Sequence, residues 1–143
     1  MKKIMFIVFL FFASTNLLAN KINGVENKIF AGVGIGSEAT ATLGVIANEE
    51  HKLSVSASSY YGDDASFALS YSYLFDLSPF FDNFKPFLGI YYIHHFGIKS
   101  EDKRFSNDTG INIGLDYLFN KKLFVSVGSQ MDSFGISANY VFN

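Results

Sequence analysis

The sequence predicts an all-β fold, an eight-stranded antiparallel up-and-down β-barrel that crosses a membrane. Three observations predict it: apolar and polar residues alternate along most of the chain, eight such runs are separated by turn residues, and the polar positions within the runs carry almost no charge. The composition agrees, because 17% of the 143 residues are aromatic and only 17% are charged, whereas globular domains average roughly 25% charged residues.

The start of the chain has the order of a secretory signal peptide. Two lysines precede an unbroken apolar stretch over 4–13, and Leu17-Leu18-Ala19 then supplies a cleavage site after the alanine. The apolar stretch is too short to cross ~30 Å of hydrocarbon as a helix. We therefore expect a cleaved signal peptide over 1–19 and a barrel over 20–143.

Alternation with period two places successive side chains on opposite faces of a strand. In the sixth run, for example, Ile111, Ile113 and Leu115 alternate with Gly110 and Asn112. Each run has about the ten residues that a tilted strand needs to cross a bilayer. The runs cover residues 29–36, 39–47, 53–61, 66–75, 87–96, 109–119, 123–131 and 134–142.

The polar face of these runs favours a membrane barrel over a soluble one. A soluble barrel exposes Lys, Glu, Asp and Arg to water, whereas the polar positions here are Gly, Ser, Thr and Asn. Small uncharged residues suit a crowded lumen, and the broad apolar face suits contact with lipid. A soluble β-barrel or sandwich stays the alternative, since its strands alternate too.

Eight antiparallel strands put both ends of the chain on one side of the membrane, which in this class is the periplasmic side. Within one connection, Ser78-Pro79 predicts a helical turn that places Phe80, Phe81 and Phe84 on one face. The predicted periplasmic turns are 48–51, 76–86 and 120–122, and the predicted external connections are 36–39, 62–64, 97–108 and 131–133.

Over residues 28–142 the chain resembles the small outer-membrane β-barrel families, such as the OmpA transmembrane domain. The resemblance lies in the Pro-aromatic-x-Gly opening at 86–92 and in the Gly-rich run at 110–117. The segment 33–38 is similar to the first hairpin of the YfaZ family. Tyr140 and Phe142 are similar to the terminal aromatic signal that the barrel assembly machinery reads, although Asn143 follows them.

The resemblance implies a place in the outer membrane of a Gram-negative-type bacterium. It also implies contacts with membrane lipids, lipopolysaccharide and the barrel assembly machinery, and a monomeric barrel. A net charge of −2 gives no electrostatic footprint for nucleic acid.

Candidate chemistry is sparse, and we predict no catalytic residue, metal or cofactor. The absence of cysteine excludes disulfides, a thiol nucleophile and cysteine-based metal sites. Gly32, Gly34 and Gly36 lack the third glycine position of a dinucleotide motif, so we interpret them as small residues inside a narrow barrel.

We predict a non-catalytic barrel with a structural or surface-interaction role through its external loops. One alternative is an enzyme that modifies lipid A in the outer leaflet, with His94 and His95 at the rim and Ser100 and Glu101 nearby. A second is a minor pore, which is disfavoured because side chains fill the interior of an eight-stranded barrel.

Asp116 is the one charge placed well within a strand, on its lumen face. An isolated buried charge is too costly, so the carboxylate must be paired or hydrogen-bonded. We predict a structural ion pair with Lys85 or Lys122 on the neighbouring strands, whereas Lys28 and Lys52 have the same parity on more distant ones. The alternative is a carboxyl group bonded only to Ser, Tyr or water.

Overall fold

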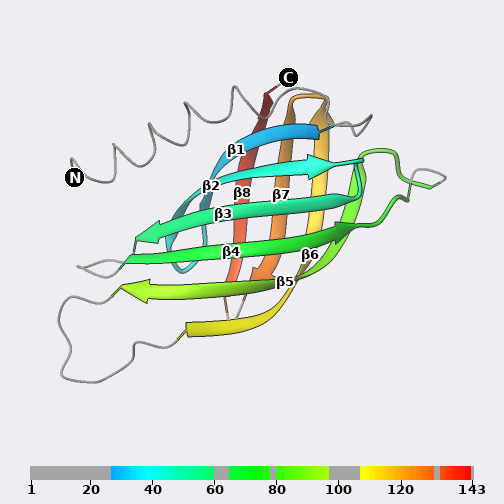
Figure 1. The fold of residues 1–143 in the computed structure, drawn as a ribbon. Helices are drawn as coiled ribbons and strands as arrows, with labels where there is room; N and C mark the ends of the chain where they lie inside the picture. The colour runs from blue at the N-terminus through cyan, green and yellow to red at the C-terminus, as the bar shows by residue number, and fades with distance from the viewer. Residues whose placement is uncertain (1–26, 60–64, 78–79, 97–106, 131–132, 143) are drawn as a thin grey trace.

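The computed structural model describes residues 27–59, 65–77, 80–96, 107–130 and 133–142, which form a closed barrel of eight strands (Figure 1). Each strand pairs antiparallel with its neighbours in sequence, and β1 pairs with β8 to close the sheet. The strands are β1 (Asn27–Ile35), β2 (Ala39–Ala47), β3 (His51–Ser59), β4 (Ala65–Leu74), β5 (Phe84–Phe96), β6 (Asn107–Asn120), β7 (Leu123–Gln130) and β8 (Ser133–Phe142).

The predicted number, order and direction of the strands are confirmed. The largest difference is at β5, which begins at Phe84, three residues before the alternating run starts, whereas β1, β3 and β6 each begin two residues early. β5 and β6 are thus the longest strands. Across the described ranges there is no helix of the length and hydropathy that a membrane crossing requires.

The barrel has two ends, which we name by what lies there. At the terminal end β1 begins and β8 ends, beside the connections 48–50, 75–83 and 121–122. At the loop end lie the connections 36–38, 60–64, 97–106 and 131–132. The predicted external segment 97–108 falls mostly outside the described residues, with only 107 and 108 placed, at the start of β6.

The two faces of each strand follow the predicted parity. In β4, exposed and buried residues alternate without interruption. Along the barrel the outward set is apolar and includes Val33, Leu53, Leu69, Ile90, Ile113 and Ile136. The buried polar set faces the lumen and comprises Lys52, Ser54, Ser66, Ser70, Ser72, Asn112, Asp116 and Asn139.

Aromatic rings fill the lumen toward the terminal end. Phe30 and Phe124 pack edge to face with their centroids 5.3 Å apart, and Val141 completes this cluster. Glycine makes room for the rings, because a Cβ at Gly44 would lie 2.5 Å from the Phe30 ring and one at Gly114 would lie 2.5 Å from the Phe87 ring. The lumen therefore has a hydrophobic core at this end.

The predicted turn between β2 and β3 forms in the expected place. Asn48 and Glu49, the first two of the three connecting residues, have φ values of 52° and 62°, and the amide of Glu50 donates to the carbonyl of Ala47 at 3.2 Å, as in a type I′ turn. Such values cost a glutamate some backbone strain.

Of the helical turn predicted between β4 and β5, Ser78 and Pro79 lie outside the described residues. The amides of Phe80 and Phe81 both donate to the carbonyl of Leu77, at 2.8 Å each. The Phe81 and Phe84 rings pack edge to face at 6.1 Å.

Candidate functional site

A buried ion pair crosses the lumen from β3 to β6. Lys52 Nζ donates to both carboxylate oxygens of Asp116, at 2.9 and 2.7 Å. The two side chains are only 9% and 3% exposed, so water screens the pair little. Lys52 Nζ also lies 4.1 Å from the centre of the Phe87 ring and 5.8 Å from that of Phe124, within the range of cation–π attraction.

The structure pairs Asp116 with Lys52, so the predicted partners, Lys85 and Lys122, were wrong. Lys85 lies directly opposite Asp116 in the β5–β6 register, yet its Nζ is 3.4 Å from Glu49 Oε2. Lys122 lies in the exposed turn after β6 and makes no ion pair with Asp116 among the described side chains. The prediction considered neighbouring strands, whereas a long side chain in a narrow barrel reaches the strand across the lumen.

Glu49 links the β2–β3 turn to β1 and β5 at the terminal end. From the β2–β3 turn its carboxylate accepts from Lys28 of β1 at 2.5 Å and lies near Lys85 of β5. The hydrogen bond from Lys28 and the positive charges of both lysines hold the pKa of Glu49 below its ordinary value. Because the turn residue reaches β1 and β5, these contacts lie across the terminal mouth of the lumen.

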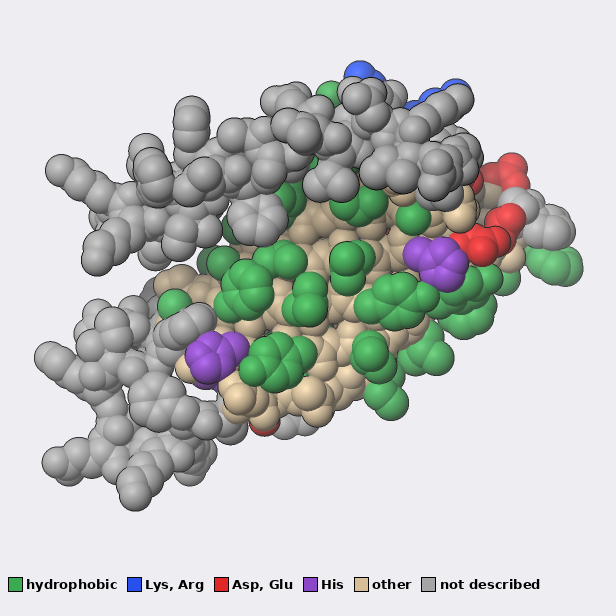
Figure 2. Space-filling view, in the orientation of Figure 1, with side chains coloured by type: hydrophobic (Ala, Val, Ile, Leu, Met, Phe, Trp, Pro, Cys, Tyr) green, Lys and Arg blue, Asp and Glu red, His purple; other side chains and the backbone are tan. Residues whose placement is uncertain are grey.

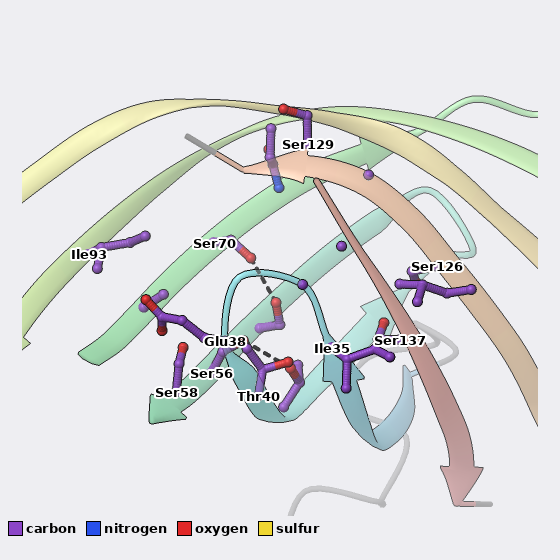
Figure 3. Close-up of a pocket in the computed structure, with 18 of the residues that line it drawn as sticks. Ile35, Glu38, Thr40, Ser56, Ser58, Ser70, Ile93, Ser126, Ser129 and Ser137 are labelled. Carbon is purple, nitrogen blue, oxygen red and sulfur yellow. Dashed lines mark hydrogen bonds between the residues drawn. The ribbon is translucent and has the colours of Figure 1, made fainter. Parts of the chain in front are cut away.

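Toward the loop end the lumen widens into a polar cavity of about 200 Å³ (Figure 3), which we call the vestibule. Hydroxyl pairs line its wall, with Ser54 and Ser70 Oγ atoms 2.7 Å apart and Thr42 Oγ1 3.0 Å from Ser56 Oγ. Lys52 and Phe87 line the vestibule at its inner end. The glycines of the Gly32–Gly36 segment pack closely, as a Cβ at Gly32 would meet Asn139 Oδ1.

The two histidines lie at the loop end but have different partners. His94 Nδ1 is 2.6 Å from Asn107 Oδ1, and His95 Nε2 is 3.6 Å from Asp108 Oδ2. The hydroxyl of Ser66, opposite His95 in the β4–β5 register, donates to Glu38 at 3.3 Å. A contact between a histidine and a hydroxyl lies elsewhere, near the terminal end, where His51 Nδ1 is 2.7 Å from the Tyr71 hydroxyl.

The two other residues of the enzymatic alternative, Ser100 and Glu101, lie outside the described residues, so their relation to the histidines is a prediction. Within the described ranges no cluster of three or more His, Cys, Asp or Glu side chains could hold a metal ion.

Sequence reasoning missed the residues that hold the ion pair in place. Lys52 has lumen parity and lies one residue into its strand, but nothing in its neighbours shows that it reaches Asp116. The sequence signal was Phe87 and Phe124, two phenylalanines at lumen parity on the strands next to β6. Large rings at such positions indicate where the lumen is filled.

Prediction for the ion pair. Lys52→Met and Asp116→Asn should each destabilise the barrel by about 3–5 kcal/mol, because each leaves a buried charge without its partner. The double variant should lose less than the sum of the two. Reversible unfolding in lipid vesicles measures all three free energies. The matched control pairs Lys85→Met with Asp116→Asn, and coupling there instead of at Lys52 would contradict the assignment.

The contacts of Glu49 with Lys28 and Lys85, which we call the terminal clamp, should make the stability depend on pH. The pKa of Glu49 is lowered in the folded protein. The stabilisation by Glu49 is therefore present above its ordinary pKa of 4.5 and is lost as the pH falls through the lowered pKa of the folded state. Glu49→Gln should therefore lower the unfolding midpoint at neutral pH and make little difference in strong acid. Glu50→Gln, in the same turn, is the control. An equal pH dependence in the two variants would exclude the clamp.

Comparisons with known proteins agree on the fold. No family model and no curated protein matches the chain, so the likeness of the first hairpin to the YfaZ family is not confirmed. Among the similar solved structures is the N-terminal β-barrel domain of Pseudomonas aeruginosa OprF, at 17% identity over 81% of this chain and 96% of that one, with a TM-score of 0.57. A de novo designed transmembrane β-barrel is 11% identical over 85% of this chain and 98% of that one, with a TM-score of 0.57. The Yersinia pestis outer membrane protein Ail is 10% identical over 82% of this chain and 100% of that one, with a TM-score of 0.50. This chain has the fold of the small eight-stranded outer-membrane β-barrels.

Proposed function

We propose that this chain spans the outer membrane of a Gram-negative-type bacterium as a non-catalytic barrel, with a structural or surface-interaction role at its loop end. The observation that carries the proposal is the apolar outer wall. Its residues would face water at great cost in a soluble protein, and contiguous apolar patches of this extent mark a membrane or partner surface.

Figure 2 shows this wall on one face of the barrel, where hydrophobic side chains run along the described strands and charged side chains are few. Aromatic side chains gather on the outer surface at the terminal end, in contact with one another. Tyr73 packs against Phe75 at 5.1 Å, and Tyr117 packs against Phe119 at 4.8 Å. Such a girdle is typical of the level where a barrel meets the lipid headgroups.

The filled lumen argues against the minor pore. The Lys52–Asp116 pair and the ring of Phe87 occupy the passage between the vestibule and the terminal end. Nearer the terminal end, Phe30, Phe124 and Val141 form a buried hydrophobic cluster. The proposed role is therefore one of surface contact, with lipopolysaccharide and other envelope or host molecules as the partners of the loops.

Catalysis on lipid A is the second candidate, and the contacts of the two rim histidines with described residues do not favour it. An activated serine needs a base within hydrogen-bond reach. His94 faces the outer side but contacts Asn107, and His95 is directed to Asp108.

The C-terminal strand carries the proposed assembly signal. Tyr140 and Phe142 both face outward on β8, with their ring centroids 5.2 Å apart. Two exposed aromatic rings at the end of the last strand present a surface that the barrel assembly machinery can bind before the barrel closes against β1.

Prediction for the outer wall. Ile113 lies near the middle of β6 and is 59% exposed. Ile113→Arg should cost about 2–4 kcal/mol, the range for a cation facing lipid at the bilayer midplane, when unfolding is measured in lipid vesicles. Ser37→Arg, in the exposed turn at the loop end, should cost almost nothing. Equal costs would refute a lipid-facing wall.

Prediction for assembly. In cells, Phe142→Ser should lower the fraction of the protein that runs as a heat-modifiable folded band, while refolding of the purified variant into detergent stays close to wild type. Phe134→Ser changes an exposed aromatic residue on the same face at the other end of β8 and is the matched control. A defect of equal size in both variants would show that general hydrophobicity, and not the C-terminal position, matters.

Prediction for the absence of catalysis. Mass spectrometry of lipid A from cells with and without the protein should give the same acyl pattern. His95→Gln should leave that pattern unchanged as well. A modification that appears with the wild-type protein and disappears with His95→Gln would replace the proposed role by the enzymatic one.

A further inference from the structure

We propose that the vestibule is a binding site for a small neutral polyol, which enters from the loop end. The inference goes beyond the surface role proposed above and does not depend on it, because it concerns only the lumen. It is carried by the shape of the cavity, by the chemistry of its lining and by the distribution of charge along it.

As bounded by the described residues, the vestibule is open toward the loop end and closed toward the terminal end. Its lining begins at the turn residues Ser37 and Glu38, at the loop end, and reaches Lys52 and Phe87 inside. A volume of about 200 Å³ is below the roughly 300–1,000 Å³ of sites for drug-sized ligands. It therefore fits a solute of a few heavy atoms, which must leave by the way it came.

Hydroxyl groups are the commonest polar groups of the lining. Nearly half of the lining residues are serine or threonine, contributed by β2, β3, β4, β7, β8 and the β1–β2 turn. Figure 3 shows Ser56, Ser70 and Ser137 among the side chains around the cavity. Each hydroxyl both donates and accepts, as the hydroxyls of a polyol do, so the two can exchange hydrogen bonds in either direction.

The charge along the vestibule selects a neutral solute. At the inner end the charge of Lys52 is matched by Asp116, and two ionisable residues, Glu38 and His95, line the mouth. Between these levels the described lining is uncharged and includes Ala68 and Ile93. An ion placed there would lose hydration without gaining a counter-charge, whereas the C–H surface of a polyol can rest on the two apolar residues.

The test is a titration of the refolded full barrel, in a detergent without a sugar headgroup and in glycerol-free buffer, followed by ¹H–¹⁵N spectra. Glycerol should give saturable shift changes at lumen positions of β3 and β4. Ethanolammonium, a cation of similar size, should give none that saturate. Shifts that rise linearly with glycerol, as for water exchange alone, or saturable binding of ethanolammonium in preference to glycerol, would overturn the proposal.

Matched variants locate the site on one strand. Ser56→Phe places a ring in the vestibule and should abolish the saturable shifts, whereas Ala57→Phe places the same ring on the outer wall and should retain them. Thr42→Val removes one lining hydroxyl with little change in volume, and should weaken binding even if Ser56→Phe does not fold. Equal binding by the wild type, Thr42→Val and a folded Ser56→Phe variant would place the glycerol elsewhere.

Discussion

The narrow lumen is the constraint on which the rest of this structure depends. A barrel of eight strands encloses just enough space for side chains, and each lumen position faces not only its neighbours in the sheet but also the strand on the far side. A large residue at one position therefore requires a small one opposite or beside it. Phe30 over Gly44 and Phe87 over Gly114 are such pairs.

The same constraint divides the lumen into two halves with different properties. Toward the terminal end, phenylalanines and aliphatic residues fill the space, and the Lys52–Asp116 ion pair is held among the rings. Toward the loop end, serine and threonine line much of the wall beside a small cluster of Ala68, Tyr91 and Ile93, and the volume that the small side chains leave is the vestibule. The size of the side chains at each height of the barrel thus decides whether the lumen is filled or open there, while the strand backbone does not differ between the two halves.

The alternation of residues was enough to predict the strands, their number and which face of each points outward, because period two is a local property of the chain. The β2–β3 turn was equally local, since Asn48 to Glu50 interrupt the pattern where the hairpin reverses. The partner of Asp116 was not local. Parity narrowed the choice to lysines on the lumen face, but the contact with Lys52 crosses from β3 to β6, and only the curvature of the closed sheet determines which strands face each other. Glu49 shows the same limit, since a turn residue reaches Lys28 and Lys85 on strands other than those it joins.

A buried ion pair is a weak source of stability, because desolvation offsets most of the attraction between the charges, and its position here suggests a different role. The register of neighbouring strands is set by their hydrophobic pattern and their turns, because backbone hydrogen bonds form in any register, and a serine- and glycine-rich lumen face specifies that register poorly. A slip of one residue in β6 would turn Asp116 outward and leave Lys52 unpaired among Phe87 and Phe124. Both outcomes place an uncompensated charge in an apolar environment, whereas the native register places none. The pair therefore penalises the wrong registers of β3 and β6 more than it favours the right one, and it does so between two strands that share no backbone hydrogen bond.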